Sequence, residues 1–423
     1  MRAIVARGPG AVNAAGRQFG LAAGAEGGYV RAVTLQQHGK AREGMAGERF
    51  YATIGVGVEQ LVGAELEALG IPVARVEPGR VRFEGGLDSA YRALIHLRCA
   101  SRVVRELYFC EISREEDIYD VVHSLDWTRW LTPEMTLKVT FNVHSSLLRS
   151  PRFGMYRIKD AVCDRMVELA GARPSVDTEE ADLHINCYLE NRRFSVGLDG
   201  AGAPLHMRGY RVAQHESPLR EHLAAAMVLQ SRWEPGAPLH DPFCGSGTIL
   251  TEAALIATRT PPTHRRERFA CMSWADFDEG AFTALRAEAQ AAILPADGLR
   301  ISGADVSDKW LAVARANVAS AGFADVIRLE QRDVAGMALE PGSWVVTNPP
   351  YGVRVGDEAK YLPAWQAFKD RLLEHPGTSV AVLGAAETVE KGLRLRPFKR
   401  NRMNNGSIPC VLAQYRIGER NGQ

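Results

Sequence analysis

The sequence predicts an α/β protein in which a small ferredoxin-like module precedes a doubly wound, Rossmann-like domain. Between residues 50 and 97 the pattern runs strand, helix, strand, strand, helix, which is typical of a ferredoxin-like unit. After residue 205, strands alternate with helices to the C-terminus, as in a doubly wound sheet. The Pro/Gly-bearing stretch at residues 199–204 separates the two parts.

Length and composition indicate a globular protein with more than one domain. The chain has 423 residues, of which 46% are hydrophobic and 24% charged. We expect no membrane association, since no apolar run is long enough to cross a bilayer. The 51 basic and 50 acidic residues leave a formal net charge of only +1. A nucleic acid would therefore have to be bound by a local basic patch.

Cysteine and histidine usage bears on location and metal content. The 7 cysteines are dispersed without a C-x-x-C pair, which predicts reduced thiols and a cytoplasmic protein. Without paired Cys or His spacing we expect no metal site. The histidines show neither ligand nor triad spacing, so no catalytic histidine is assigned.

The elements of the two parts follow from residue periodicity. Residues 1–47 are Gly- and Ala-rich, and we expect a disordered extension or a non-native start ahead of Met45, with a transit peptide as the alternative. Apolar spacing then predicts strands and helices at residues 50–54, 58–69, 73–83, 89–97 and 137–143, a basic helix at 156–169, and two strands within 183–198.

A glycine-containing loop follows the first strand of the second part. The strand ends at Asp241, and Gly245 and Gly247 permit positive φ and close approach of the backbone to a ligand. A phosphate loop would end in Gly-Lys-Ser/Thr, and a dinucleotide loop would have a third glycine. The acid at the strand end instead suits the cationic methionine part of S-adenosylmethionine. The predicted cofactor loop also includes Phe243, Cys244, Ser246 and Thr248.

Two later strands also end near acids. Asp305 ends the strand at 301–305, where a carboxylate can accept both ribose hydroxyls, and a helix capped by Ser307 follows. Asp333 follows the strand at 326–329 and is a candidate for the adenine amine. Either acid alone could equally cap a helix, but acids at successive strand ends favour a cofactor pocket. We include the adjacent Val306 and Val334 in that pocket.

The segment Asn348-Pro349-Pro350-Tyr351, after a buried strand, predicts the reaction. An exocyclic base amine is a poor nucleophile, because its lone pair is delocalised into the ring. The Asn348 side-chain oxygen and the Pro349 carbonyl are predicted to accept its hydrogens and to direct the lone pair at a sulfonium methyl. Tyr351 would stack on the extruded base. A proline-rich surface loop is the alternative structural interpretation, and the same tetrapeptide also serves glutamine-amide methylation.

These motifs resemble the THUMP-domain RNA guanine-N2 methyltransferases, most closely the bacterial 23S rRNA enzymes of that group. The resemblance runs from residue 50 to residue 415. Its most specific segments lie outside the common methyltransferase motifs, at residues 153–165, 173–177, 208–211, 218–224, 272–274 and 405–410.

The resemblance implies the domain organisation, the cofactor and the partner. A ferredoxin-like/THUMP module over residues 48–205 would bind structured RNA, ahead of a class I (Rossmann-like) S-adenosylmethionine-dependent methyltransferase domain over 206–423. Pro218 and Leu219 would complete the cofactor pocket, and Asn348 would contact both substrate and cofactor. The expected partner is 23S rRNA or a large-subunit precursor, with a monomer favoured. Some bacterial members carry a second, fused methyltransferase domain, whose activity we expect to be absent here.

Two basic clusters are candidates for RNA contact. Arg149, Arg152, Arg157 and Lys159 bracket the predicted THUMP helix and can neutralise phosphates. A second cluster precedes a predicted hairpin turn at Asn405-Gly406, and we expect it to line the path to the pocket. It comprises Arg394, Arg396, Lys399, Arg400 and Arg402. For any one of these residues, a solvated surface is the alternative.

Three other functions stay open at this point. THUMP relatives also methylate tRNA, so a tRNA guanine-N2 methyltransferase is the nearest alternative. An RNA-binding ribosome-assembly factor with secondary catalysis is an alternative of another class. A protein glutamine methyltransferase is disfavoured, because the THUMP-like half would then have no purpose.

Overall fold

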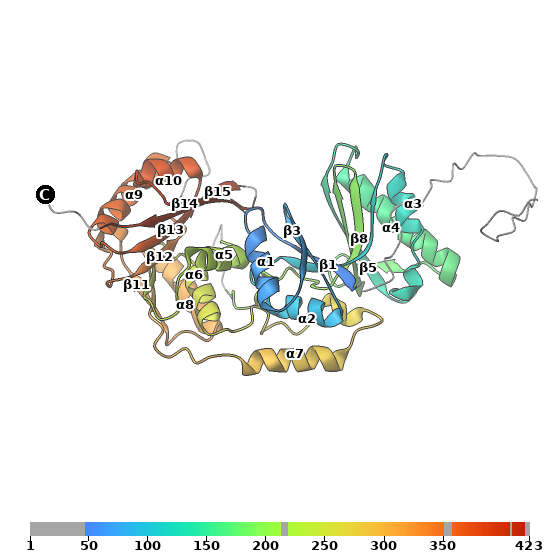
Figure 1. The fold of residues 1–423 in the computed structure, drawn as a ribbon, viewed down its shortest axis with the longest axis horizontal. Coiled ribbons are helices and arrows are strands. Elements are labelled where there is room, and N and C mark those ends of the chain that lie inside the picture. Colours follow the sequence, from blue (N-terminus) through green and yellow to red (C-terminus); the bar gives the residue numbers. More distant parts are fainter. Residues whose placement is uncertain (1–46, 213–218, 351–357, 407, 419–423) are drawn as a thin grey trace, which may run out of the picture. The chain divides into compact units, whose positions relative to one another are not determined.

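The computed structural model describes residues 47–212, 219–350, 358–406 and 408–418, and their strands form an eight-stranded and a seven-stranded sheet (Figure 1). The predicted extension at residues 1–47 lies almost wholly outside the described residues. Two predicted site residues, Pro218 and Tyr351, lie outside them as well.

The first part of the chain forms the predicted ferredoxin-like unit. Its elements are β1 (Glu48–Thr53), α1 (Glu59–Ala68), β2 (Val73–Glu77), β3 (Arg80–Gly85), α2 (Leu87–His96) and β4 (Arg102–Glu111). β1 lies between β3 and β4 and is antiparallel to both. The strand-like stretch at 73–83 contains the two consecutive strands of the predicted pattern, β2 and β3, which form a hairpin where Gly79 adopts φ +76°.

The next elements extend this sheet. They are α3 (Asp117–His123), the 3₁₀ helix η1 (Trp127–Arg129), β5 (Thr136–His144), α4 (Pro151–Ala170), β6 (Ser175–Val176), β7 (Leu183–Glu190) and β8 (Arg193–Asp199). β8 pairs antiparallel with β4, so the sheet continues in the order β2-β3-β1-β4-β8-β7-β5-β6. α4 begins ahead of the predicted residue 156, because Pro151 fits its first turn and the Ser150 hydroxyl caps the Phe153 N–H.

The second sheet forms the predicted doubly wound domain. Its elements are α5 (Glu221–Ser231), β9 (Leu239–Asp241), α6 (Thr248–Ala257), η2 (Ala270–Ser273), α7 (Glu279–Ala291), β10 (Ile301–Asp305), α8 (Asp308–Ser320), β11 (Ile327–Gln331), η3 (Val334–Gly336), β12 (Trp344–Thr347), α9 (Glu358–Leu373), β13 (Ser379–Gly384), α10 (Ala386–Leu393), β14 (Lys399–Asn405) and β15 (Ile408–Arg416).

The strand order of this domain marks where a ligand binds. The order is β11-β10-β9-β12-β13-β15-β14, with β15 antiparallel to β13. β10 and β12 flank β9 on opposite sides, and both run parallel to it. The winding therefore reverses at β9. In open α/β sheets, ligands bind beyond the carboxyl ends of the strands at this reversal.

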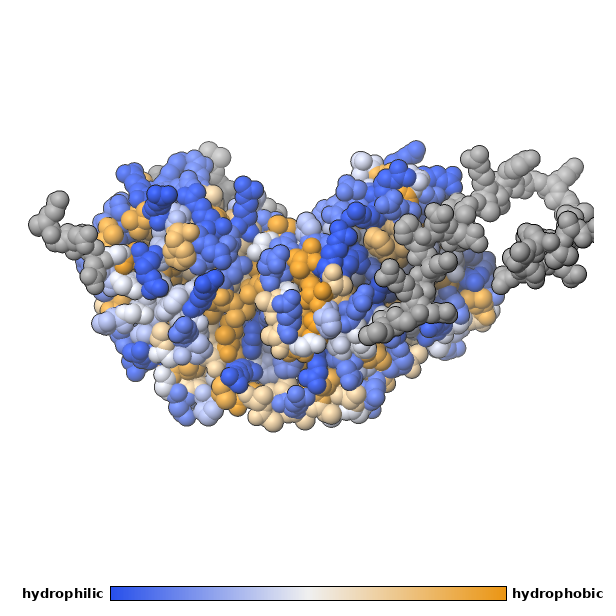
Figure 2. Space-filling view, viewed as in Figure 1, coloured by the Kyte–Doolittle hydropathy of each residue, from blue (hydrophilic) through white to orange (hydrophobic). Residues whose placement is uncertain are grey.

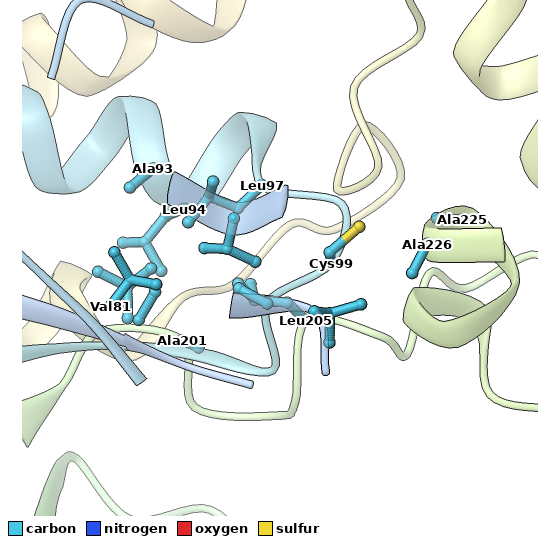
Figure 3. Packing of buried hydrophobic residues seen from close by; sticks show 14 of the residues in the cluster. Val81, Ala93, Leu94, Leu97, Cys99, Ala201, Leu205, Ala225 and Ala226 are labelled. Atoms are coloured by element: carbon cyan, nitrogen blue, oxygen red, sulfur yellow. The ribbon is translucent and has the colours of Figure 1, made fainter. Parts of the chain in front are cut away.

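One apolar core extends from the ferredoxin-like unit into the doubly wound domain. Figure 3 shows Leu94 and Leu97 near α2 on one side, Ala225 and Ala226 of α5 on the other, and Cys99 between them. All five residues are buried. Fully burying a Leu side chain contributes about 1.5–3 kcal/mol, so these residues stabilise the core that the two parts share.

A buried ion pair lies beside this core. Arg208 is fully buried, and its Nε donates to Oε1 of Glu252 on α6 at 3.4 Å. The same guanidinium donates to the backbone carbonyl oxygens of Leu205 and Arg98. The Tyr210 hydroxyl also donates to Glu252 Oε1, at 3.1 Å. Because α6 follows the glycine loop, these bonds tie that helix to the ferredoxin-like unit.

Hydrophilic side chains cover most of the face seen in Figure 2, with apolar side chains in patches between them. The exposed large apolar side chains include Phe153, Tyr156 and Phe398. Within the described ranges, none of the helices has the length and apolar character needed to cross a membrane.

Candidate active site

Asp241 lies at the carboxyl end of the central strand β9 and is only 1% exposed. Its Oδ1 accepts hydrogen bonds from the Thr347 hydroxyl at 2.6 Å and from the Phe243 N–H at 3.1 Å. Burial raises the pKa of Asp241 to about 7, although these two hydrogen bonds favour the ionised form. This strand end therefore presents a buried carboxyl group that a polar or cationic ligand group can contact.

The loop after Asp241 curves around this acid and is tied to β10. Gly245 and Gly247 adopt φ +50° and +76°, as the sequence predicts for glycine at these positions. The Cys244 N–H donates to the Ala304 carbonyl at 2.9 Å. A Cβ on Gly247 would lie 3.3 Å from the Ala314 Cβ, so glycine also lets α6 approach α8 closely.

Asp305, at the end of β10, is oriented by two backbone N–H groups. Its Oδ2 accepts from Gly245 at 3.0 Å, and its Oδ1 accepts from Ser307 at 2.9 Å. Each carboxylate oxygen keeps a second lone pair that a ligand hydroxyl can use. The neighbouring Val306 is 66% exposed.

Asp333 lies two residues beyond β11 and is exposed. Its Oδ1 accepts from the Ala335 N–H at 2.8 Å and caps η3, which is the helix-capping role that the sequence left open. Val334 is buried beside it. The Arg332 N–H donates to the Asp305 carbonyl at 3.1 Å, so this segment joins the same edge of the sheet.

Asn348 and Pro349 directly follow β12, the neighbour of β9. The Asn348 Oδ1 is buried and accepts no hydrogen bond from any residue that the structure describes. On the far side of this dipeptide, the Pro350 carbonyl accepts from the Trp365 indole N–H at 3.0 Å. Thr347, which directly precedes Asn348, is held by its hydrogen bond to Asp241. The structure therefore brings Asn348 close to the loop after Asp241.

Sequence reasoning missed Arg211 and Asn317, two side chains that support the site. The Arg211 guanidinium donates to the Leu219 carbonyl at 2.9 Å and to the Thr248 hydroxyl at 3.0 Å. The Thr248 hydroxyl also hydrogen-bonds the Ser246 hydroxyl. Asn317 donates to the Ser246 carbonyl at 3.1 Å. Only Arg211 carried a signal, since it ends the 208–211 motif.

The first basic cluster lies around α4. Arg149 and Arg152 are exposed, and the Arg152 Nε donates to the Tyr156 hydroxyl at 3.1 Å. Arg157 stacks over the Tyr119 ring at 4.6 Å, and Lys159 pairs with Asp160 at 2.7 Å. Three of the four predicted cations, all but Arg149, therefore already have partners within the described part of the protein.

The second basic cluster lies on the edge strand β14 and in the segment before it. Arg396, Lys399 and Arg400 are exposed, and Arg400 pairs with Glu390 at 2.9 Å. The strand register aligns Arg400 with Thr347 through the pairs Arg400↔Ala413, Ala413↔Val382 and Val382↔Thr347. Arg402 thus lies toward the carboxyl end of β12, where Asn348 follows. Lys399 and Arg396 lie in the opposite direction, toward the amino end of β12.

The predicted hairpin between β14 and β15 is confirmed, with a shift in its turn. Asn405 pairs with Ile408, so it is the last residue of β14 rather than the first of the turn. Gly406 adopts φ +64°, as a tight turn requires.

The strand order and the strand-end acids define a Rossmann-like methyltransferase. Residues 208–414 match the family described as "RMKL-like, methyltransferase domain", residues 49–104 match the RlmL ferredoxin-like domain, and residues 113–199 match the THUMP domain. Residues 208–414 are thus a domain of the RMKL-like methyltransferase family, preceded along the chain by the ferredoxin-like and THUMP domains.

Similar proteins carry corresponding names. The chain is 35% identical over 376 residues to "Ribosomal RNA large subunit methyltransferase K/L" of Photobacterium profundum, covering 87% of this chain and 53% of that protein. The chain thus spans about half the length of that relative.

Solved structures are similar over most of the chain. The methyltransferase SMU.472, complexed with SAH, is 27% identical with a TM-score of 0.79, covering 90% of this chain and 100% of its own. A predicted N6-adenine-specific DNA methylase from Listeria monocytogenes is 31% identical with a TM-score of 0.77, covering 87% and 96%. TrmN from Thermus thermophilus, at 20% identity and a TM-score of 0.63, shares the fold over 87% and 99%.

Proposed function

We propose that this chain is an S-adenosylmethionine-dependent RNA methyltransferase that forms N2-methylguanosine in 23S rRNA. The observation that carries the proposal is the Asn348 Oδ1, a buried acceptor without a described partner, next to the Asp241–Thr347 hydrogen bond. A buried polar atom without a partner is costly, so its retention here suggests that a substrate donor completes it.

The residues at the strand ends fit the cofactor. S-adenosylmethionine supplies a methyl group on a sulfonium, together with an ammonium and two ribose hydroxyls. Asp241 has no ion-pair partner among the described residues and can accept the cationic methionine part. Asp305 offers its free lone pairs to the ribose, and Val306 and Val334 flank the adenine. Asp333 would contact the adenine amine through Oδ2, since Oδ1 caps η3.

Catalysis then depends on how the protein holds the amine. The Asn348 Oδ1 and the Pro349 carbonyl each accept a hydrogen bond from one of the two amine N–H groups. These bonds draw the nitrogen lone pair out of conjugation and direct it toward the methyl group. The positioned acceptors contribute mainly through orientation, which can supply several powers of ten in rate. Pro349 and Pro350 hold this backbone extended. Tyr351 is proposed to stack on the extruded base.

We assign RNA contact to the two basic clusters. Arg149 and Arg152 are exposed beside the aromatic rings of Phe153 and Tyr156 on α4. Such pairs of cations and rings bind unpaired nucleotides by charge and stacking. On β14, Arg402 lies nearer the catalytic edge than Arg396 and Lys399 do, so it is the cation that we expect to guide the target strand. The module at 48–205 would thus hold RNA for the domain at 206–423.

The test is methyl transfer from labelled S-adenosylmethionine to purified rRNA and tRNA, followed by nucleoside analysis. We expect N2-methylguanosine in 23S rRNA, and Asn348→Ala should lower the rate at least 100-fold while SAH affinity changes far less. N2-methylguanosine in tRNA instead would identify tRNA as the substrate. N6-methyladenosine would keep the amine chemistry but overturn the base assignment. A knockout phenotype that Asn348→Ala fully rescues would favour an assembly factor.

A further inference from the structure

Helix α9 contacts both loops of the candidate active site through two aromatic residues on one face. Trp365 is 1% exposed, and its indole N–H donates to the Pro350 carbonyl at 3.0 Å. One turn later, Phe368 is fully buried and meets the Phe243 ring edge-on, with the ring centroids 5.5 Å apart. Phe243 belongs to the loop after Asp241. One helix therefore supports the cofactor loop and the Asn348 loop together.

The Trp365 bond fixes the segment that presents the acceptors. The Asn348-Pro349 dipeptide has a hydrogen bond on either side, from Thr347 to Asp241 and from Trp365 to Pro350. Neither proline has an N–H, so hydrogen bonds to this stretch must come through its carbonyls. The indole ring packs closely on Gly392, where an added Cβ would lie only 2.6 Å from its Cε3.

We propose that Trp365 is a positioning residue for methyl transfer, which acts by setting the direction of the Asn348 and Pro349 acceptors through Pro350. The inference rests on the proposed function. Trp365 does not contact the reacting atoms. Its removal should therefore slow the transfer step without weakening cofactor binding, since a displacement of about 1 Å at a reacting centre costs on the order of 100-fold in rate.

The first measurement is single-turnover methyl transfer by Trp365→Phe, which keeps an aromatic ring but removes the donor. We expect a 10- to 100-fold slower transfer, with the SAH dissociation constant within about twofold of wild type. Trp233→Phe is the matched control. Trp233 is 6% exposed, and its N–H donates to the Ala237 carbonyl at 2.9 Å, ahead of β9 and away from the strand ends. This control should retain the wild-type rate.

A second readout does not depend on substrate. Amide hydrogen exchange at residues 344–348, the last backbone amides before the two prolines, should be faster in Trp365→Phe than in wild type, and unchanged in Trp233→Phe. If wild type methylates no RNA but this difference in exchange appears, the proposed function fails, while the role of Trp365 in holding the Asn348-Pro349-Pro350 segment is retained. If exchange and transfer rate both match wild type, or if rate and SAH affinity fall in parallel, the positioning role is overturned.

Gly392→Ala is a second variant in case Trp365→Phe does not fold. It keeps the indole donor but displaces the ring that a new Cβ would meet. The same loss of transfer rate with retained SAH affinity supports the proposal. A wild-type rate in a folded Gly392→Ala protein, shown by thermal unfolding, counts against it.

Discussion

Two of the buried acids in the methyltransferase domain, Glu252 and Asp241, differ in what surrounds them. Glu252 is fully buried and accepts hydrogen bonds from the Arg208 guanidinium and the Tyr210 hydroxyl. Asp241 is equally buried, yet among the described residues it accepts only from a hydroxyl and a backbone N–H. A buried acid with its own cation serves the structure, whereas one without a cation is a candidate ligand site.

The largest effect is expected at the paired acid. Glu252→Gln removes the carboxylate that pairs directly with the buried Arg208, so we expect a loss of about 3–5 kcal/mol in the free energy of unfolding. Urea unfolding measures this change. The double variant Glu252→Gln/Arg208→Met should lose less than the single variant, because the guanidinium that pairs with Glu252 is removed as well. A loss below about 1 kcal/mol in the single variant would show that the pair is not structural.

At Asp241 the effect on stability should have the opposite sign. Burial raises its pKa from 3.8 to about 7, so its contribution to stability is full below pH 3.8 and is lost as the pH rises through 7. At pH 8, Asp241→Asn removes a desolvated charge and keeps the oxygen that Thr347 contacts. We expect about 1–3 kcal/mol of added stability, together with a loss of SAH affinity of at least tenfold.

Thermal unfolding and calorimetric SAH titration at pH 8 check both halves of this expectation. Asp305→Asn is the comparison variant, because Asp305 is only half-buried and is bonded to two backbone N–H groups. It should lower SAH affinity without adding stability. If Asp241→Asn is less stable than wild type at pH 8, Asp241 behaves like Glu252 and the contrast between the two acids is lost.

The same contrast shows which features the sequence can predict. Asp241, Asp305 and Asn348 end neighbouring parallel strands, and the strand-end rule alone brings them to one edge. Thr347, which bonds to Asp241, and Trp365, which bonds to Pro350, were missed. A threonine in a buried strand and a tryptophan on a helix have the sequence pattern of ordinary core residues. Such partners depend on which elements pack together in three dimensions.

The sequence pattern also could not predict which distant segments pair as neighbouring strands. The pairing of β4 with β8 joins the ferredoxin-like unit and the following elements in one sheet. Alternating apolar residues indicate that each segment is a strand, but they do not identify its neighbour. Equally, α4 could be recognised as a helix from its periodicity, while the pairing of Lys159 with Asp160 depends on side-chain conformation.

The smallest expected effect, and the most direct test of the unpaired acid, is the pH dependence of cofactor binding. A cationic ligand group stabilises the ionised form of Asp241, whose pKa is about 7 before binding. SAH should therefore bind with full affinity above pH 7 and lose up to about tenfold per pH unit below it, or about 1.4 kcal/mol. Calorimetric titration between pH 5.5 and 8 measures this slope. Asp241→Asn should bind weakly with no slope over that range, because it has no proton to exchange, whereas Glu252→Gln should keep the wild-type slope. A flat profile in the wild-type protein would mean that Asp241 does not receive the ligand's charge, and the distinction between the two buried acids would have to rest on stability alone.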